Sequence, residues 1–325
     1  MPSAQEDIAD ALLDRSITLA RLEASEEKKI RALLEAAARE MATRLQRSDP
    51  TAPRLPAWRQ QRFVTLQREI EGVLREAYRT AATEHATTLE TVARAEAAHT
   101  VALLETAFPD AASVGGLNEA RLRVLLDELL LGGAPAPEWW ARQAGTWGQQ
   151  VQDVLRQGMA LSETLAELVA RVRALTGMRV RDAEALVRTA LTTVANKTRL
   201  AVYERNSDVV SGVQWLTTLD TRACLRCIPL SALVWDMDHK PVGHTKPWPG
   251  PPPLHWQCRC VLIPVLVGFE PVEDRTFEAW LRDQPEAKQE KVLGDLRWRL
   301  WKEGKLRLTQ LTDQQHNPLT IEALT

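Results

Sequence analysis

Residues 224–260 read CLRCIPLSALVWDMDHKPVGHTKPWPGPPPLHWQCRC and contain all four cysteines of the 325-residue chain. The thiols lie at the two ends of this stretch: Cys224 and Cys227 form a C-x-x-C pair, and Cys258 and Cys260 form the second group. His255 precedes Cys258 with the same spacing as the first pair. Thiolates and imidazoles at this spacing allow both side chains of one tight turn to reach a single ion, usually zinc.

The sequence around the cysteines cannot supply a large apolar core. The segment DHKPVGHTKPWPGPPPL (238–254) is rich in proline and glycine and is predicted to be loop. Strand candidates flank it, VVSGVQWLTTLD (209–220) and VLIPVLV (261–267), because both contain many β-branched residues. A fold this small usually needs a staple. We therefore predict a metal-binding module over 209–268, with two or three short strands and a structural Zn²⁺.

The candidate ligands outnumber the four positions of a closed zinc site. Either all four cysteines bind and His255 lies outside, or His255 binds with three cysteines and one of Cys258 and Cys260 is spare. Disulfides are the first rival explanation, disfavoured in a reducing compartment. A redox C-x-x-C is the second, disfavoured because no βαβ pattern follows it. So many soft ligands favour a closed structural site over an open catalytic one, so we expect no enzyme.

Composition narrows the class of protein. Hydrophobic residues make up 45% of the chain and charged residues 26%, as in soluble globular proteins, and a net charge of −2 excludes a globally basic nucleic-acid coat. No apolar run is long enough for a transmembrane helix. The N-terminal residues MPSAQEDIAD lack the apolar core of a signal peptide, so we expect the protein in the cytoplasm where it is made.

The first third of the chain is predicted to be helical. Apolar residues recur at helical spacing from Ile8 to Leu45, and again from Trp58 to Phe108. The stretch SDPTAPRLP (48–56) separates the runs, because proline cannot continue a helix. A helix of about 50 residues would be roughly 75 Å long. We therefore expect the second run to form a long antiparallel hairpin or an extended arm.

Helical patterns also occupy most of the remaining chain outside 209–268. A capping box at Ser3 and Glu6 opens the first helix. The next predicted helix is LNEARLRVLLDELLL (117–131), ended by Gly132 and Gly133, and another follows APAP (134–137) and contains Trp139, Trp140 and Trp147. The remaining predicted helices are one N-capped by Ser162, one over about 182–205, and two after Thr276. The predicted fold class is thus mainly α, with long helices and a small zinc-stapled α+β module near the C-terminal third.

The predicted organisation has four consecutive parts. They are an N-terminal helical arm or bundle (1–133), a helical part (134–208), the Cys/His metal-binding module (209–268) and a C-terminal helical tail (269–325). Within the module, Asp220 precedes Arg222 and is predicted to tie the turn before Cys224. His239 and His244 are predicted to be solvated loop histidines.

Three segments resemble a known family. VRTALTTVANKTRLAVYE (187–204), VQWLTTLDTRACLRC (213–227) and PPPLHWQCRCVLIPV (251–265) are similar to the Mu F-like head-morphogenesis family of tailed phages, also called minor head proteins. The matching positions are Arg188, Thr189, Ala195, Asn196, Trp215, Asp220, Arg222, Cys224, Cys227, Pro252, Pro253, His255, Cys258, Arg259 and Cys260. The resemblance covers about 137–325. Two positions depart from it. Relatives usually carry glycine where this chain has Ser231, and often carry glutamate where it has Ala190.

The resemblance implies a structural minor head protein, not an enzyme. It would act in head morphogenesis at the portal vertex or head interior, and aid DNA packaging or ejection. Its partners would be the portal protein and other head proteins, with packaged DNA as a further candidate and no membrane or small-molecule substrate. It would be found in the virion, and in the host cytoplasm during assembly.

Two alternative functions remain at this stage. The first is a zinc-stapled nuclease of the His-Asn-His type using His239 or His244, although no suitable Asn follows Cys260 before residue 317. The second is a zinc-stapled DNA-binding module, because basic residues and tryptophans interleave around the cysteines. These residues are Arg222, Arg226, Lys240, Lys246, Arg259, Trp235, Trp248 and Trp256.

Overall fold

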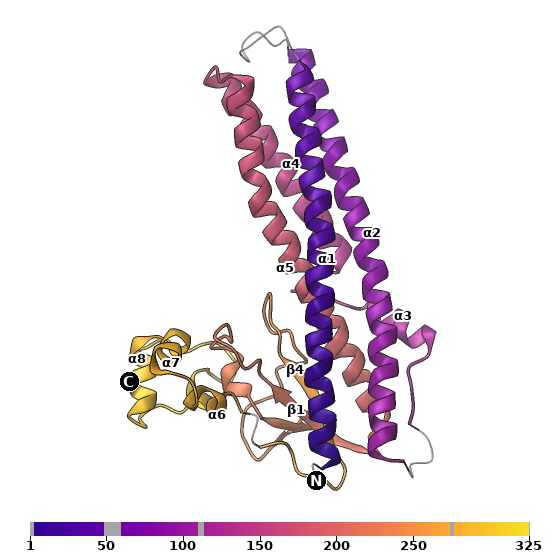
Figure 1. The fold of residues 1–325 in the computed structure, drawn as a ribbon, viewed down its shortest axis with the longest axis vertical. Helices are drawn as coiled ribbons and strands as arrows, with labels where there is room; N and C mark the ends of the chain where they lie inside the picture. The colour runs from indigo at the N-terminus through magenta and orange to yellow at the C-terminus, as the bar shows by residue number, and fades with distance from the viewer. Residues whose placement is uncertain (1–2, 49–59, 110–113, 274–275, 325) are drawn as a thin grey trace. The chain divides into compact units, whose positions relative to one another are not determined.

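The computed structural model describes residues 3–48, 60–109, 114–273 and 276–324. Helices predominate and one small antiparallel sheet lies in the C-terminal third, which confirms the predicted mainly α fold class (Figure 1). The chain forms two compact units: one contains Met1–Leu19, Val92–Leu126 and Thr192–Thr325, and the other contains Ala20–Thr91 and Asp127–Leu191. No helix of the described residues is long and apolar enough to cross a membrane.

The two long N-terminal helices are confirmed. Helix α1 spans Ala4–Ser48 and α2 spans Gln60–Ala107. The predicted capping box is present: the Ser3 amide donates to Glu6 Oε2 at 2.6 Å, and the Glu6 amide donates to Ser3 Oγ at 3.3 Å. The predicted break at 48–56 lies, except for Ser48, outside the described residues, as does Trp58.

The second unit is a four-helix bundle. It is formed by parts of α1, α2 and α5 (Leu165–Arg205), together with α4 (Ala136–Ala160). Its centre is aromatic: the Tyr78 ring lies 6.1 Å from the rings of both Trp140 and Trp147. Burial of these two tryptophans agrees with helix-packing positions for them. An ion pair between Arg31 and Glu184, and a hydrogen bond from Thr88 Oγ1 to the buried Glu26 carboxylate, join facing helices.

A buried histidine makes the stability of this bundle depend on pH. Trp140 Nε1 donates to His85 Nδ1 at 3.1 Å, which requires an unprotonated Nδ1. Burial lowers the pKa of His85 to about 4, against a smaller opposing effect of Glu26. Because the folded pKa lies below the unfolded one, stability is complete above the unfolded pKa and falls as the pH drops from about 6.5 towards 4.

We expect this histidine to cost the bundle up to about 3 kcal/mol of unfolding free energy over that interval. Urea unfolding at several pH values measures it, with His85→Gln as the matched variant, because carboxylates titrate equally in both proteins. Identical pH profiles for the two proteins would contradict the prediction.

Two predicted helix boundaries are wrong. Helix α3 covers only Glu119–Asp127, so Gly132 and Gly133 do not end it; both have positive φ and form a turn in which the Leu131 amide donates to Ala134 O at 2.8 Å. This shorter helix allows Leu129 and Leu131 to be buried from an extended backbone.

The N-cap of α5 is also different from the prediction. Ser162 has a φ of 55° and does not cap the helix. Thr164 does so, because its Oγ1 accepts from the Glu167 amide at 3.3 Å while Glu167 Oε2 accepts from the Thr164 amide at 2.6 Å. Helix α5 then continues without interruption to Arg205, where two separate helices were predicted.

The sheet has four antiparallel strands in the order β3-β2-β1-β4. Strands β1 (Val210–Leu216) and β4 (Val261–Leu266) confirm the two predicted strands, and β2 spans Val234–Asp236. Strand β3 (Pro241–Val242) lies in the segment predicted to be loop. The proline that suggested a loop is tolerated because it occupies an edge strand, where a missing N–H breaks no central pairing.

The outer edge of β4 is satisfied by side chains from two helices. Asn196 of α5 donates to Cys260 O at 3.1 Å and accepts from the Leu262 amide at 3.0 Å. Gln5 of α1 donates to Pro264 O and accepts from the Leu266 amide, both at 2.8 Å. Buried backbone groups need such partners. These two amide side chains therefore anchor β4, and with it the end of the cysteine-containing stretch, to the helices of the first unit.

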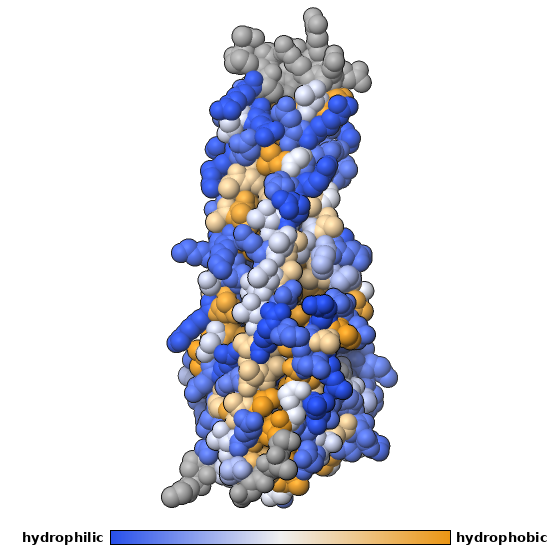
Figure 2. Space-filling model, turned by 90° about the vertical axis from the view of Figure 1, so that its right-hand side faces the viewer, coloured by the Kyte–Doolittle hydropathy of each residue, from blue (hydrophilic) through white to orange (hydrophobic). Residues whose placement is uncertain are grey.

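The C-terminal helices pack against the turn that carries the first two cysteines. They are α6 (Phe277–Arg282), α7 (Glu286–Leu293) and α8 (Asp295–Lys302), followed by a 3-10 turn η3 (Leu308–Gln310). Their apolar side chains form one cluster with Ile228, including Phe277, Leu293 and Trp301. Hydrophilic residues cover most of the face shown in Figure 2, with hydrophobic residues between them in several places.

Gly212 is the position in β1 where a side chain cannot fit. A Cβ there would lie 2.4 Å from Trp235 O on β2, which is backbone and cannot yield. We expect Gly212→Ala to lower the unfolding free energy by about 2–3 kcal/mol, measured by urea unfolding. Gly72→Ala is the control, because nothing lies within 4 Å of a Cβ added at Gly72. Equal stability of the two variants would contradict this account of the β1–β2 contact.

Candidate metal centre

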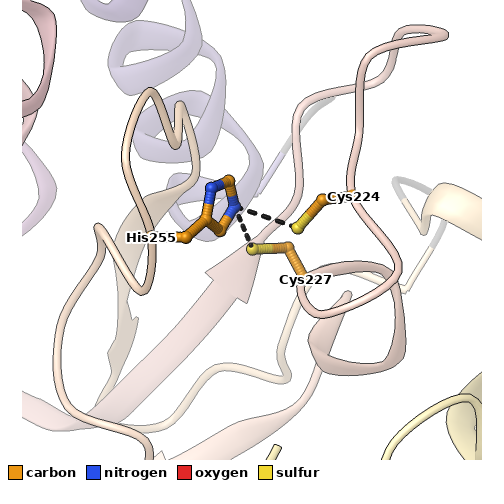
Figure 3. A group of neighbouring side chains, drawn as sticks. All are labelled: Cys224, Cys227 and His255. Carbon is orange, nitrogen blue, oxygen red and sulfur yellow. Dashed lines mark hydrogen bonds between the residues drawn. The ribbon is translucent and has the colours of Figure 1, made fainter. Parts of the chain in front are cut away.

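Two tight turns present the cysteines and the histidine. In the first, the amides of Cys227 and Ile228 both donate to Cys224 O at 3.0 Å, and the 3-10 turn η2 (Ile228–Leu230) follows directly. In the second, the Cys258 amide donates to His255 O at 3.2 Å. Each turn therefore brings side chains three residues apart to the same side. Figure 3 shows the side chains of Cys224, Cys227 and His255 pointing toward one another from the two loops.

The five predicted ligands come together in two overlapping groups. Cys224, Cys227 and His255 form one group, and Cys227, Cys258 and Cys260 form the other. Within each group all ligand atoms lie within 4.8 Å of one another, and Cys227 belongs to both. His255 is therefore part of the cluster. This disfavours the alternative in which His255 lies outside.

The distances have the scale of tetrahedral coordination. Cys227 Sγ lies 3.8 Å from Cys258 Sγ, and His255 Nε2 lies 2.9 Å from Cys224 Sγ and 3.4 Å from Cys227 Sγ. Two thiolates bound to zinc at about 2.3 Å are roughly 3.8 Å apart in a tetrahedron. A disulfide needs about 2.05 Å, and all four cysteines are free thiols, so the disulfide alternative is contradicted.

The cluster favours positive charge at its centre. The Cys224 thiol has its pKa lowered to about 5, mainly by a hydrogen bond with Cys227, with a further contribution from His255. Hydrogen bonds with Cys224 and then Cys258 raise the pKa of His255 to about 10. The contact between Cys224 and His255 contributes to both shifts, because an imidazolium and a thiolate stabilise each other, whereas hydrogen bonds with Cys224 and then Cys258 raise the pKa of Cys227. Thiolates are also the form in which cysteines bind metals.

The orientation of His255 is fixed through its second ring nitrogen. His255 Nδ1 lies 2.8 Å from the carbonyl oxygen of Trp256 and is placed to donate to it. That contact leaves Nε2 facing the sulfur atoms. Metal-binding histidines usually donate their other N–H to a carbonyl or carboxylate in this way.

An ion pair links the two cysteine turns. Arg259 donates to both oxygens of Asp220, at 2.6 and 2.9 Å, and Asp220 also accepts from the Arg222 amide at 2.8 Å. Burial alone would raise the pKa of Asp220. The hydrogen bonds from Arg259 and Arg222 outweigh this effect, so the pKa of Asp220 lies below its ordinary value. Asp220 thus ties the turn before Cys224, as predicted, and connects that turn to the residue between Cys258 and Cys260.

We expect Asp220→Asn to weaken metal binding about tenfold, because the bidentate charged contact that holds the two turns together becomes a neutral one. A competition titration with a chromogenic chelator measures the affinity for Zn²⁺. Asp238→Asn is the matched control, since Asp238 pairs with Lys240 in an exposed position. Equal affinities of the two variants would contradict a supporting role for Asp220.

Trp215 and Arg222 occupy different positions from the cluster residues. Trp215 is fully buried in β1 and pairs through its backbone with Leu233 and Ala232, so its place is in the sheet core. The Arg222 side chain is 74% exposed and lies 3.7 Å from Asp220.

Sequence reasoning missed two threonines that support the turns. Thr217 Oγ1 donates to Cys227 O at 2.9 Å, and Thr218 Oγ1 donates to Arg259 O at 2.8 Å. Their signal in the sequence was a pair of hydroxyl residues directly after an apolar strand.

The loop histidines are less solvated than predicted: both pack against tryptophans and are of intermediate exposure, and 34% of the His239 side chain remains exposed. The His239 ring stacks on Trp248 with centroids 4.7 Å apart. His244 lies against Trp235, and its Nε2 is 2.7 Å from Val234 O. The tryptophans of the loop provide the apolar surface that these rings need.

Most of the basic residues around the cluster have internal partners. Arg226 donates to Leu254 O at 3.1 Å, and Lys240 pairs with Asp238 at 2.9 Å. Lys246 donates to Thr312 O at 2.6 Å and to Asp313 O at 3.0 Å, which ties the loop to the C-terminal segment. The side chains of Arg222 and Lys240 stay 74% and 71% exposed, although each pairs with a nearby aspartate.

Comparison with known proteins gives one match. Residues 149–263, roughly a third of the chain, match the family described as Phage Mu protein F like protein. This confirms the family resemblance over a stretch that begins in α4, ends in β4 and contains every candidate ligand. No curated protein and no solved structure matches the chain.

Proposed function

We propose that this chain is a structural protein of a phage head that acts in head morphogenesis, and that one Zn²⁺ holds its Cys/His module in shape. The match to the phage Mu F-like family supports the first part. The convergence of four thiols and one imidazole supports the second. The family resemblance suggests a location in the virion, and we propose the portal vertex or the head interior.

The donor set fits zinc better than other common ions. Thiolate and imidazole ligands select Zn²⁺ or related soft ions, whereas Ca²⁺ and Mg²⁺ require oxygen ligands. We assign the four positions to Cys224, Cys227, His255 and Cys258, because each tight turn then supplies two ligands at the same spacing. Cys260 is the spare thiol in this assignment. With all positions filled by protein, the ion would act as a staple and not as a catalyst.

Zinc content tests the metal assignment. Purified, reduced protein should contain one Zn²⁺ per chain by mass spectrometry of the metal. Cys258→Ser should lose it, and Cys260→Ser should keep it. Substitution by Co²⁺ should give the d–d absorption of a site with three thiolates and one imidazole. Loss of zinc from Cys260→Ser but not from Cys258→Ser would overturn the choice of ligands.

The proposed place of action has its own test. Particles and proheads purified from the phage or prophage that encodes this chain should contain the polypeptide in a fixed ratio to the portal protein. Deleting its gene should reduce the yield of filled heads. Particles that lack the polypeptide and assemble normally without its gene would contradict the proposal, whatever the metal content of the protein.

A role for the chain in DNA packaging or ejection is part of the same proposal. The nuclease and DNA-binding alternatives have less support, since His239 and His244 pack on tryptophan rings and the basic residues near the cluster pair with other groups of the chain. We therefore propose a scaffold role without enzyme activity.

A further inference from the structure

The cysteine cluster contains one thiol that the proposed zinc site does not use. Cys260 is 3% exposed, and its sulfur lies within 4.8 Å of the sulfurs of Cys227 and Cys258. Cys258 and Cys260 are two residues apart on a segment without helix, so their side chains can point to the same side. A buried thiol beside two others is a potential ligand for soft metal ions.

The backbone around this thiol is held by side chains from other segments. Asn196 of α5 donates to Cys260 O at 3.1 Å, and Thr218 Oγ1 donates to Arg259 O at 2.8 Å. Strand β4 begins at the next residue, Val261, and pairs with Leu216 of β1. Cys260 is therefore fixed in place by the sheet and by α5, and its position does not depend on binding zinc.

The five donors divide into two sets of three. Cys224, Cys227 and His255 form the first set, Cys227, Cys258 and Cys260 form the second, and only Cys227 belongs to both. A thiolate sulfur has several lone pairs and can bind two ions at once. With Cys227 as a bridge, the five donors offer six bonds, three to each of two ions. The same side chains therefore allow a second arrangement besides the four-ligand zinc site.

The second set suits an ion that needs no fourth ligand. Cys227, Cys258 and Cys260 are 1%, 2% and 3% exposed, so water has little access to an ion between them. Protein-bound zinc almost always takes four ligands in a structural site. Cu(I) is a soft ion that thiolates select, and it is stable with three ligands in a plane. A buried set of three thiols therefore favours Cu(I) over a divalent ion.

We propose that the cluster binds two Cu(I) ions in place of one Zn²⁺, with the Cys227 thiolate as a bridge and Cys260 as a ligand of the second ion. The exchange involves no electron transfer: two Cu(I) ions enter, one Zn²⁺ leaves, and the Cys260 thiol loses its proton. The proposal rests on the same cluster as the proposed zinc site, and goes beyond it by giving Cys260 a role.

An anaerobic titration of the zinc-loaded, full-length chain tests this proposal. Cu(I) is added as its acetonitrile complex, with bicinchoninate present as a chelator that removes weakly bound copper. Native mass spectrometry should show saturation at two Cu(I) per chain, together with loss of the zinc. X-ray absorption at the copper edge should show three sulfur or nitrogen neighbours for each ion and a copper–copper contact, as expected for a thiolate-bridged pair.

Cys260→Ser separates the copper pair from the zinc site. This variant should contain one zinc before the titration, which shows that its module is folded, and should bind one Cu(I) instead of two. His239→Gln is the matched control, because His239 lies in the loop between the two turns but belongs to neither set of ligands. It should still bind two Cu(I), which excludes copper binding by loop histidines as the source of the second ion.

The possible failures of this proposal and of the zinc site can be distinguished. Saturation of the wild-type chain at one Cu(I), binding of two Cu(I) by Cys260→Ser, or two ions without a copper–copper contact would overturn the copper proposal, even if the purified chain holds one zinc. A wild-type chain that binds two Cu(I) but never retains zinc would support the copper proposal and contradict the zinc assignment alone.

Discussion

Removal of the metal is expected to unfold the sheet module around the cysteines while the four-helix bundle stays folded. Structural zinc sites contribute on the order of 10 kcal/mol to the folding of small modules. Strands β1 and β4 pair along most of their length, but β2 and β3 have only three and two residues and add few pairing contacts. Without the ion, the direct contacts that join the two cysteine turns to each other are the Asp220–Arg259 pair and the bonds from Thr218 to Arg259 O and from Arg226 to Leu254 O.

Cys227→Ser is the sharpest variant for this prediction, because Cys227 is shared by both ligand groups. It should lose zinc and lower the melting temperature as much as chelation does. Hydrogen exchange should speed up in β1 and β4 but stay slow in the bundle segments 60–91 and 136–160. Cys260→Ser is the control and should change neither zinc content nor exchange. Slow hydrogen exchange in β1 and β4 after complete removal of the metal would contradict the structural role of the ion.

The second large effect is expected at a buried ion triad in the first unit. Glu96 is fully buried and Arg199 is 1% exposed; Arg199 Nη2 lies 2.6 Å from one Glu96 oxygen, and Arg15 Nε lies 2.6 Å from the other. Changing Glu96 to Gln leaves a buried guanidinium without a counter-charge. Breaking a buried pair in this way costs about 3–5 kcal/mol.

Urea unfolding measures this cost. The double variant Glu96→Leu with Arg199→Met tests its origin, because replacing both buried partners by apolar residues is often neutral or stabilising. We therefore expect the double variant to be clearly more stable than Glu96→Gln. A single variant within about 1 kcal/mol of the wild type would contradict the account. Equal losses of unfolding free energy in the two variants would show that altered packing, and not the missing counter-charge, causes the destabilisation.

The cluster could be predicted because its information is local. Two turns of the same spacing, C-x-x-C and H-x-x-C, specify which side chains can meet an ion, and the β-branched segments beside them specify β1 and β4. The supporting contacts were not predictable, because they join distant segments. Glu96 is 81 residues from Arg15 and 103 from Arg199, and Asn196 is 64 from Cys260. Helical periodicity indicates which face of a helix is buried, but not what packs against it.

Wrong predictions came from residues whose local preference was overridden by packing. Two separate helices were predicted between Ser162 and Arg205, yet α5 continues from Leu165 to Arg205 without interruption. Pro241 predicted a loop, but pairing with β2 makes a short strand there. His239 and His244 were predicted to be solvated because they lie in the Pro- and Gly-rich loop, whereas Trp248 and Trp235 give them apolar neighbours. The compact units are also assembled from non-consecutive segments, which the order of the sequence does not indicate.

The amide side chains along β4 limit how copies of this protein can associate. Gln5 and Asn196 occupy the backbone positions that another polypeptide would use to add itself to that border. The opposite border consists of β3, where Pro241 offers no donor. Fibre-like growth by strand addition therefore has almost no template on either side.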